Sequence, residues 1–350
     1  MIISRTPHRI SFFGGGTDYP SWYLEHGGKV LGAAIDKYCY ITCRELPPFF
    51  KHKHRIAYSK VETVNHIDEI QHPSVKSTLK YLGVERGLEI HHDGDIPALS
   101  GMGSSSAFTV GLIKTLYALE GKIILKEELF KKAIHIEQNI IKESVGSQDQ
   151  VWAACGGVNT IEFLHNGNIV VRPVIMKEQD LRGFESRFML LFTGRARFAS
   201  EIAKEQIQNT SKNKSELKEM RGLVDEAEKI LVRGGGDFTD FGRLLNETWE
   251  LKKRLSDKIS NIEIDHIYDT AIRNGAVGGK LLGAGNGGFM VFYAEPESQK
   301  KIKEALRGYI HVPFRFDFSG SEIMVYKPDY YNGNGSGAVY FEKKALELNA

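Results

Sequence analysis

The sequence predicts an α+β protein built from two domains. Its 350 residues are about twice the size of a typical domain of roughly 150 residues. The first half alternates segments of strand and helix pattern, whereas the second half begins with an apolar strand and continues into a long, charged helical block. We therefore place the domain boundary near residues 180–186 and expect domains at residues 1–184 and 185–350.

The elements of the first domain follow from local pattern. Runs of Val, Ile and Tyr favour strands, and apolar residues at three- and four-residue spacing favour helices. Asn166-Gly167 predicts a hairpin turn between two further strands. The spacing of Ser147 and Gln150 predicts a capping box at the start of a helix. The expected strands cover residues 2–13, 30–44 and 88–92, and the expected helices cover 73–82, 107–119, 126–142 and 147–154.

The second domain is expected to contain more helix and fewer strands. A glycine triplet at 234–236 should break its long helical block, because glycine weakens helix interiors. A glycine-rich loop at 275–288 should precede the second of its strands. The expected strands cover residues 188–192 and 289–293, and the expected helices lie within 200–255 and at 264–274 and 296–308.

Composition narrows the class of protein. Apolar residues make up 41% and charged residues 26% of the chain, as in ordinary globular proteins. The formal net charge of +2 gives no long-range attraction to nucleic acid or anionic lipid, so we expect neither as a partner. A phosphate-bearing partner would have to be held by local geometry. We leave the oligomeric state open between a monomer and a homodimer.

Cysteine usage and the N-terminus bear on the compartment. The three cysteines form no C-x-x-C pair, so we expect neither a structural zinc site nor a disulfide framework, and a reducing compartment is favoured. The first residues carry Arg5, His8 and Arg9 and do not resemble a signal peptide. No apolar run approaches the ~18 residues that span a bilayer. We therefore expect a cytoplasmic protein.

A glycine- and serine-rich loop is the strongest functional signal. It runs from Pro97 to Ala107 and leads directly into the expected helix 107–119. The first turn of a helix presents unpaired N–H groups and a partial positive charge, and glycines let the backbone approach a ligand. A single serine would suffice for a helix cap. The loop therefore predicts a phosphate-binding site formed by Gly101, Met102, Gly103, Ser104, Ser105 and Ser106.

This loop differs from two other glycine-containing motifs. No G-x-x-x-x-G-K-S/T sequence occurs in the chain, so it is not the common nucleotide P-loop. Residues 103–107 nearly match the G-x-S-x-G nucleophile elbow but end in Ala107. A serine hydrolase using Ser105 is therefore an alternative.

Two acidic residues are candidates for chemistry. Glu137 falls within the apolar stripe of the expected helix 126–142, four residues after Ala133 and four before Ile141. A buried carboxylate needs a cation, so both a salt bridge and a metal ligand remain open. Asp149 lies in the first turn of the next expected helix, where the dipole alone favours an acid. Its sequence neighbours are uncharged, however, so no local charge accounts for it.

Two further glycine motifs complete the set. The expected strand 2–13 delivers the chain to a glycine triplet followed by Thr17 and Asp18, which suits recognition of a polyhydroxylated ligand or a simple Asx-type turn. The stretch from Lys280 to Gly288 contains G-x-G-x-x-G. In our interpretation a helix precedes it and a strand follows, the reverse of a dinucleotide-binding motif, so we expect a tight loop packed against a ligand or another loop.

In this order the motifs resemble the GHMP kinases, the superfamily of galactokinase, homoserine kinase and mevalonate kinase. Residues 7–19 resemble the first family motif. Residues 97–106 match the family phosphate loop P-x-x-x-G-L/M-G-S-S-A/S, and residues 280–288 match the third motif. The resemblance covers nearly the whole chain. It implies a ribosomal-protein-S5-domain-2-like N-terminal domain and a ferredoxin-like C-terminal domain.

Within the superfamily, the triple glycine and the stretch 193–200 resemble the heptose 7-phosphate kinases and, less closely, the fucokinases. The resemblance implies transfer of a phosphoryl group from ATP to the anomeric hydroxyl of heptose 7-phosphate, giving heptose 1,7-bisphosphate for GDP-heptose synthesis. A fucokinase-like or other sugar 1-kinase is the alternative within the superfamily. A non-catalytic nucleotide or sugar sensor on the same fold is the alternative outside enzymes.

The resemblance also implies residue roles. Asp149 matches the catalytic aspartate, and Arg9 matches the basic residue near the transferred phosphate. Glu137 and Ser105 match the ligands of Mg²⁺. The implied sugar contacts are Gly15, Gly16, Thr17 and Asp18, and the third-motif loop is represented by Gly283, Gly285, Gly287 and Gly288.

A sugar phosphate needs a second cationic pocket. Arg195 and Arg197 follow the buried strand 188–192, and Lys51, Lys53 and Arg55 form a basic run that is more typical of a solvated face. We therefore expect Arg195 and Arg197 to bind the 7-phosphate.

Overall fold

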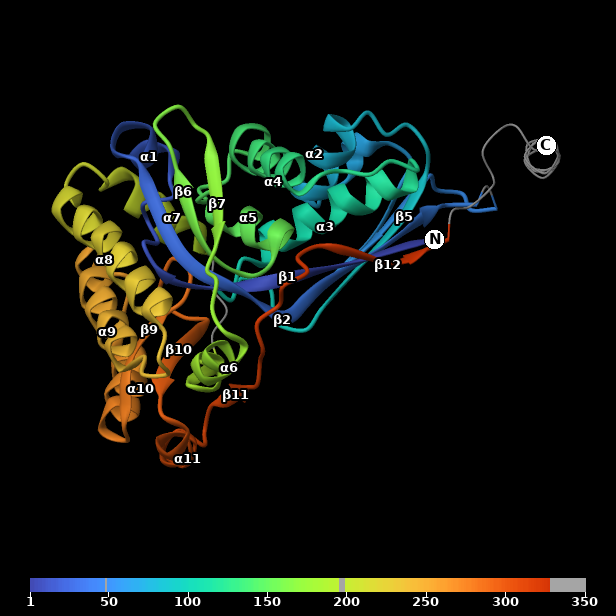
Figure 1. Cartoon of the computed structure of the whole chain (residues 1–350). Helices are drawn as coiled ribbons and strands as arrows, with labels where there is room; N and C mark the ends of the chain where they lie inside the picture. Colours follow the sequence, from blue (N-terminus) through green and yellow to red (C-terminus); the bar gives the residue numbers. More distant parts are fainter. Residues whose placement is uncertain (48, 195–198, 328–350) are drawn as a thin grey trace, which may run out of the picture.

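The computed structural model describes residues 1–47, 49–194 and 199–327. The strands in this part of the chain form two separate sheets, one of eight strands and one of four. Figure 1 shows the larger sheet extending to the right and the smaller one at the lower left, among the helices α8 to α10. The predicted α+β fold with two domains is confirmed.

The first sheet is organised around two long strands, β1 and β2, which are antiparallel neighbours. Residues 28–33 of β2 pair with β6, and residues 39–45 pair with β5, so β2 joins two branches of the sheet. The strands of this sheet are β1 (Ile2–Phe13), β2 (Gly28–Glu45), β3 (His54–Ala57), β4 (Val61–Val64), β5 (Leu88–Gly94), β6 (Val158–Phe163), β7 (Ile169–Pro173) and β12 (Glu322–Tyr326).

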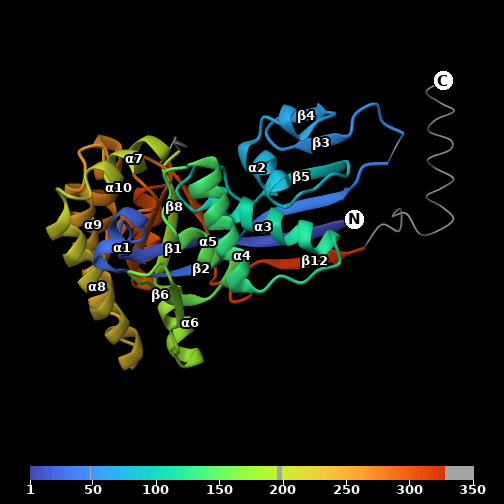
Figure 2. The ribbon, with the colours of Figure 1, turned by 90° about the horizontal axis from the view of Figure 1, so that it is seen from above.

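Helices cover one face of this sheet. The central helix α3 packs on β1 and β2, and α4 and α5 pack beside it. Figures 1 and 2 show α3, α4 and α5 together on the same side of the sheet. The helices of this part are α1 (Pro20–His26), the short 3₁₀ turn Ile67–Glu69, α2 (Pro73–Tyr81), α3 (Ser104–Leu119), α4 (Lys126–Ile134) and α5 (Gln148–Cys155).

The second sheet has the strand order β11-β8-β10-β9, and its adjacent strands are antiparallel. Numbered within this domain, the order is 4-1-3-2, as in ferredoxin-like folds. Helices α9 and α10 pack against β9. The elements are α6 (Glu178–Ser186), β8 (Phe188–Phe192), α7 (Ala199–Gln208), α8 (Lys214–Arg233), α9 (Thr239–Arg254), α10 (Ile262–Arg273), β9 (Ala276–Leu281), β10 (Phe289–Ala294), α11 (Pro296–Ala305) and β11 (Ile310–Val312).

The chain returns to the first sheet after β11. Phe316 forms an isolated bridge with Ile35, and β12 pairs with the outer edge of β1. The predicted second domain, residues 185–350, thus contains a segment, residues 322–326, that belongs to the sheet of the first domain. This pairing joins segments more than 300 residues apart, so local pattern could not reveal it.

Several elements differ from the predictions. The expected helix 126–142 changes after Ile134 into a π-helical segment, His135–Ile141, that contains Glu137. The helical block also breaks between α7 and α8, in addition to the glycine triplet after α8. The expected capping box at Ser147 does not form, because Gln150 donates to Glu137 and Ser147 Oγ accepts from Gln138 Nε2.

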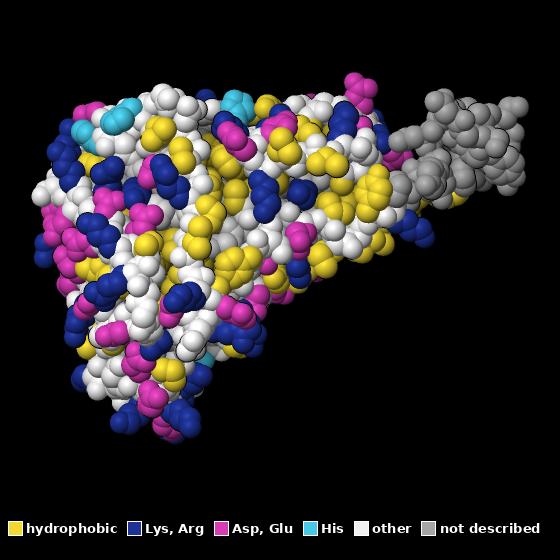
Figure 3. Space-filling view, viewed as in Figure 1, with side chains coloured by type: hydrophobic (Ala, Val, Ile, Leu, Met, Phe, Trp, Pro, Cys, Tyr) yellow, Lys and Arg dark blue, Asp and Glu magenta, His cyan; other side chains and the backbone are white. Residues whose placement is uncertain are grey.

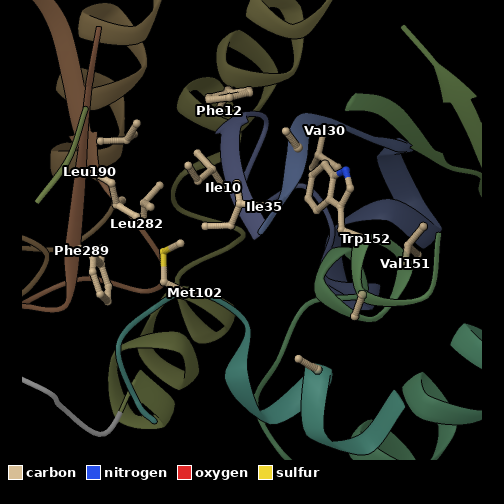
Figure 4. Packing of buried hydrophobic residues seen from close by; sticks show 14 of the residues in the cluster. Ile10, Phe12, Val30, Ile35, Met102, Val151, Trp152, Leu190, Leu282 and Phe289 are labelled. Atoms are coloured by element: carbon tan, nitrogen blue, oxygen red, sulfur yellow. The ribbon is translucent and has the colours of Figure 1, made fainter. Parts of the chain in front are cut away.

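An aromatic cluster joins the two domains. Phe12 of β1 stacks on Phe188 of β8 with ring centroids 4.9 Å apart, and it meets Phe241 of α9 edge-on at 5.5 Å. Phe184 of α6 and Phe316 complete the cluster. Figure 4 shows Phe12 and Ile10 facing the second domain. The two sheets therefore share one apolar core at the base of the site described below.

The surface carries mixed charge. On the face shown in Figure 3, Lys and Arg side chains are interspersed with Asp and Glu, most densely over the helices α8 to α10. No helix in the described residues is long and apolar enough to span a membrane.

Candidate active site

A cavity of about 510 Å³ lies between the two domains, and all three glycine motifs contribute to its walls. The predicted site residues that line it are Arg9, Gly15, Gly16, Asp18, Gly101, Gly103, Ser104, Ser105, Ser106, Asp149 and Gly283. The remaining predicted residues within the described chain do not line the cavity: Thr17, Met102, Glu137, Gly285, Gly287 and Gly288. The structure thus brings most of the predicted residues together.

The phosphate loop ends at the N-terminus of α3. Gly103 is the N-cap residue and has a φ of +77°, a left-handed conformation that favours glycine. Helix α3 begins at Ser104, three residues earlier than predicted, so Ser104, Ser105 and Ser106 form its first turn. The first-turn N–H groups have no acceptor within the helix, and they lie at the cavity wall. This geometry suits an anion with several oxygens.

Arg9 forms an ion pair with Asp149 next to this loop. Arg9 Nε donates to Asp149 Oδ1 at 2.7 Å, and Arg9 Nη2 donates to Oδ2 at 2.6 Å. Arg9 Nη1 donates to the carbonyl oxygen of Gly101 at 2.7 Å. The Arg9 side chain is 6% exposed and that of Asp149 is 23% exposed. A bidentate pair fixes the plane of the carboxylate while leaving it accessible from the cavity.

Glu137 is fully buried, and no Lys or Arg of the described residues forms an ion pair with it. Its Oε2 accepts hydrogen bonds from Ser106 Oγ, at 2.8 Å, and from Gln150, whereas its Oε1 is buried without a hydrogen-bond partner. Burial and the nearby charge of Glu143 raise the pKa of Glu137 to about 7. The salt bridge considered in the sequence analysis is therefore absent from the described residues.

Glu143 completes an acidic pair beside the loop. Ser105 Oγ donates to Glu143 Oε2 at 3.3 Å, and burial raises the pKa of this carboxyl. An orphaned carboxylate oxygen next to a second carboxylate and two hydroxyls is a set of hard oxygen donors. Mg²⁺ in phosphate-transferring enzymes is commonly held by one or two carboxylates together with the substrate phosphates. The residues present therefore fit a magnesium ion.

Gly15 and Gly16 of the glycine triplet also line the cavity, and Asp18 is the polar group that follows them. Asp18 Oδ1 accepts from the backbone N–H of Gly16 at 3.0 Å, and Oδ2 accepts from that of Gln148 at 3.4 Å. Burial and the charge of Asp149 raise the pKa of Asp18 to about 6. Asp18 and Asp149 are thus two carboxylates facing one cavity, as recognition and activation of hydroxyl groups require.

Thr17 and Met102 contribute differently from the prediction. Thr17 Oγ1 donates to the carbonyl oxygens of Gly14 and Lys29, so it closes the turn and does not face the cavity. The Met102 side chain is fully buried, and Figure 4 shows it extending from the loop toward the apolar junction with Leu282. Only the Met102 backbone is close to the site, where its carbonyl oxygen accepts from Arg9 N at 3.3 Å.

The third-motif loop packs directly on the phosphate loop. A Cβ added to Gly283 would lie 2.5 Å from the Cα of Gly101, and one added to Gly288 would lie 2.2 Å from the Ser100 carbonyl oxygen. Both glycines have positive φ. The predicted close packing against another loop is confirmed. The expectation that a helix directly precedes this loop was wrong, because the strand β9 precedes it. The strand β10 follows it, however, so the strand-to-helix order of a dinucleotide site is still absent.

Two buried lysines that the sequence analysis did not select also line the cavity. Lys280 of β9 donates to the Phe12 carbonyl oxygen at 2.8 Å, and Lys252 of α9 donates to those of Leu281 and Gly283. A signal existed for each. Lys280 begins the third motif, and Lys252 follows Leu245 and Trp249 at seven and three residues, on the apolar face of α9.

The structure does not support the serine hydrolase alternative. Ser105 Oγ donates to Glu143, and no histidine of the described residues lines the cavity. A Ser–His–acid arrangement requires a histidine within hydrogen-bond reach of the nucleophile. Arg195 and Arg197, predicted to bind the sugar phosphate, lie outside the described residues.

The cavity combines a phosphate loop at the N-terminus of α3 with a carboxylate, Asp149, that is held by Arg9. Phosphotransferases use such a combination to bind phosphates and to position the attacking hydroxyl. Family comparison agrees: the profile "GHMP kinases N terminal domain" matches residues 70–157, and "GHMP kinases C terminal" matches residues 223–311. A D-glycero-alpha-D-manno-heptose 7-phosphate kinase of Campylobacter jejuni is 32% identical over 327 residues, covering 88% of this chain and 95% of that protein. The chain belongs to the GHMP kinases, which transfer a phosphoryl group from ATP to an alcohol.

The chain is also similar to two further sugar kinases. The crystal structure of a D-glycero-D-manno-heptose 1-phosphate kinase from Bacteriodes thetaiotaomicron has a TM-score of 0.74 at 26% identity, covering 93% of this chain and 100% of that one. An L-fucokinase/L-fucose-1-P guanylyltransferase of Bacteroides fragilis is 25% identical over 348 residues, covering 87% of this chain and 36% of that longer protein.

Proposed function

We propose that this kinase phosphorylates the anomeric hydroxyl of D-glycero-D-manno-heptose 7-phosphate, giving ADP and heptose 1,7-bisphosphate for GDP-heptose synthesis. The observation that carries the proposal is the placement of Asp149. Its carboxylate is held by Arg9 at the phosphate loop and faces the same cavity as Asp18 and the glycine triplet. The similarity to two heptose phosphate kinases supports the choice of sugar.

The chain's own groups divide the work. The first-turn N–H groups of α3 hold the phosphates of ATP, and the helix dipole adds favourable potential. Asp18 accepts hydrogen bonds from sugar hydroxyls. Asp149 accepts the proton of the anomeric hydroxyl while the oxygen of that hydroxyl attacks the γ-phosphorus of ATP. Arg9 keeps the carboxylate aimed at that hydroxyl and offsets negative charge that develops in transfer.

Mg²⁺ supplies charge neutralisation at the phosphates when it is bound. We assign its protein ligands to Glu137 and Ser105, as the family resemblance implies. The hydrogen bonds of Ser106 to Glu137 and of Ser105 to Glu143 add a second carboxylate and a second hydroxyl to the candidate set. Glu143 follows Glu137 by six residues, across the end of the π-helical segment.

A panel of acceptors tests the proposal. ADP release is measured with Mg·ATP and, in turn, heptose 7-phosphate, unphosphorylated heptose, L-fucose, galactose and mannose. The proposal predicts the highest kcat/KM for heptose 7-phosphate. A higher value for L-fucose would instead support the fucokinase-like alternative. ATP binding without turnover of any acceptor would support a sensor and contradict the proposal.

A further inference from the structure

The second-domain wall of the cavity carries two buried ammonium groups with unusual surroundings. Lys252 is 7% exposed and Lys280 is 2% exposed, yet both line the cavity. Among the described residues, neither forms an ion pair with a carboxylate. Their hydrogen-bond partners are backbone carbonyl oxygens. Burying a charge without a counter-charge is costly, so its retention calls for a ligand.

The hydrogen-bond inventory leaves donors free for that ligand. An ammonium group has three N–H donors. Lys280 uses one of them on Phe12, and Lys252 uses two of them on Leu281 and Gly283. Three donors therefore remain between the two side chains. A tetrahedral oxyanion can accept all three, whereas an uncharged sugar hydroxyl would leave the charge uncompensated.

The charges near the two lysines also favour an anionic ligand. Burial, together with the charge of Arg9, lowers the pKa of Lys280 to about 7, and the charge of Asp18 opposes this shift. Burial also lowers the pKa of Lys252 well below its ordinary value, with Lys280 and Arg9 as further causes. Arg9 is already paired with Asp149. In their charged forms these three groups repel one another, and a dianion bound among them would relieve this repulsion and favour the protonated lysines.

We propose that the ammonium groups of Lys252 and Lys280 bind a phosphate group of the reactants on the second-domain side of the cavity. Two reactants can supply that group: ATP, through its γ-phosphate, and the acceptor, through its own phosphate. The second source rests on the proposed heptose 7-phosphate, whereas the first needs only the kinase activity. In both cases the second domain, and not only the phosphate loop, provides charge to the reaction.

The decisive comparison uses Lys280→Met and Lys252→Met, which keep chain length and remove the charge. Lys253→Met is the matched control, because Lys253 is the next residue on α9 and contacts Glu250 and the Trp249 ring outside the cavity. Dissociation constants for Mg·ADP and for the nonhydrolysable ATP analogue AMPPNP are measured by calorimetry. KM values are measured for heptose 7-phosphate and unphosphorylated heptose.

The two sources give different results. If the lysines bind the γ-phosphate, AMPPNP affinity falls about 10-fold or more while ADP affinity is unchanged. If they bind the acceptor phosphate, KM rises by a similar factor for heptose 7-phosphate and not for heptose. Equal losses of affinity for ADP and AMPPNP would mean that the variants only disturb the loop at Gly283. Unchanged affinities and KM values would mean that the two charges do not contact a phosphate group. Either result overturns the proposal.

A measurement on the folded wild type guards against variants that do not fold. Binding of AMPPNP and of heptose 7-phosphate is followed by calorimetry from about pH 6 to about pH 9. The groups facing Lys280 are Arg9 on β1, Asp18 after β1 and Lys252 on α9. Affinity should fall as Lys280 loses its proton, and Lys280→Arg should flatten this limb because arginine stays charged. An unchanged limb in Lys280→Arg contradicts the role of Lys280.

Discussion

Asp149 shows how tertiary structure changes the interpretation of a residue. Its sequence neighbours are uncharged, and a first-turn acid is explained by the helix dipole alone. In the fold, Arg9 arrives from a strand 140 residues away and makes two hydrogen bonds to the carboxylate. An acid that only stabilised a helix would not need a buried, bidentate cation at a cavity wall.

Asp149→Asn tests its role as proton acceptor. The amide keeps the shape of the side chain but cannot take the proton of the hydroxyl, so kcat should fall by about 10²- to 10⁴-fold. AMPPNP affinity should change little, because the phosphate-loop amides are retained. Steady-state kinetics and calorimetry provide both numbers. A variant with near-normal kcat would remove Asp149 from the chemistry.

Glu137 gives a pH-dependent prediction for stability. Its pKa is about 7 in the fold, compared with 4.5 in the unfolded chain, so the folded state binds this proton more tightly. The free energy of unfolding should therefore fall as pH rises from about 4.5 to about 7. Glu137→Gln carries no charge to bury and should be more stable than wild type at pH 8, by an amount on the order of 3 kcal/mol.

The same variant should lose function at low magnesium. Its requirement for Mg²⁺ in turnover should rise, because a carboxylate ligand is missing. Urea unfolding at pH 5 and pH 8 and magnesium titrations of activity are the measurements. Glu128→Gln, at a half-exposed position on α4, is the control. An unchanged magnesium titration together with lower stability would indicate a purely structural Glu137.

At the scale of elements, the contact between the two glycine loops couples the domains. Gly283→Ala would place a methyl group against the Gly101 backbone and push the loops apart. Gly235 has a similar positive φ but no atom within 4 Å of an added Cβ, so Gly235→Ala isolates the backbone strain. We expect Gly283→Ala to weaken AMPPNP binding about tenfold, equivalent to about 1.4 kcal/mol. Equal affinities in the two variants would contradict the coupling.

The predictability of elements follows local signal strength. The long strand β1 and the strands β8 and β10 are apolar runs and were found close to their observed bounds. β9 was missed because its sequence, AVGGKL, has two adjacent glycines, whose low strand propensity concealed it. β12 was missed because it lies at a sheet edge, where its strand partner β1 is more than 300 residues away in the sequence.

At the scale of the whole molecule, one aromatic cluster holds both sheets, so the domains should unfold together. Phe12 is fully buried and contacts rings from α6, β8 and α9. Phe12→Ala should cost about 3–5 kcal/mol, whereas Phe318→Ala, at an exposed position, should cost little. Denaturant unfolding followed by far-UV dichroism and tryptophan fluorescence should give coincident transitions. Separate transitions for the two probes would show independent domains.

The candidate site was predictable in its motifs and not in its assembly. Glycine and serine patterns report local backbone geometry, so the phosphate loop and the third-motif loop were recognisable. The inward position of Lys252 depends on how α9 packs on β9, and its neighbours Lys253 and Arg254 make the segment look like a solvated face. The side-chain position of Met102 could not be predicted for the same reason: its backbone is part of the phosphate loop, whereas its side chain packs in the core.

The most direct test of the central claim is ³¹P NMR of the 350-residue protein with Mg·ATP and D-glycero-D-manno-heptose 7-phosphate. The account predicts the resonances of ADP and a new anomeric phosphate, with the 7-phosphate signal retained, and coupling constants that report the anomer. Intact ATP, or a new phosphate at any position other than the anomeric oxygen, would contradict it.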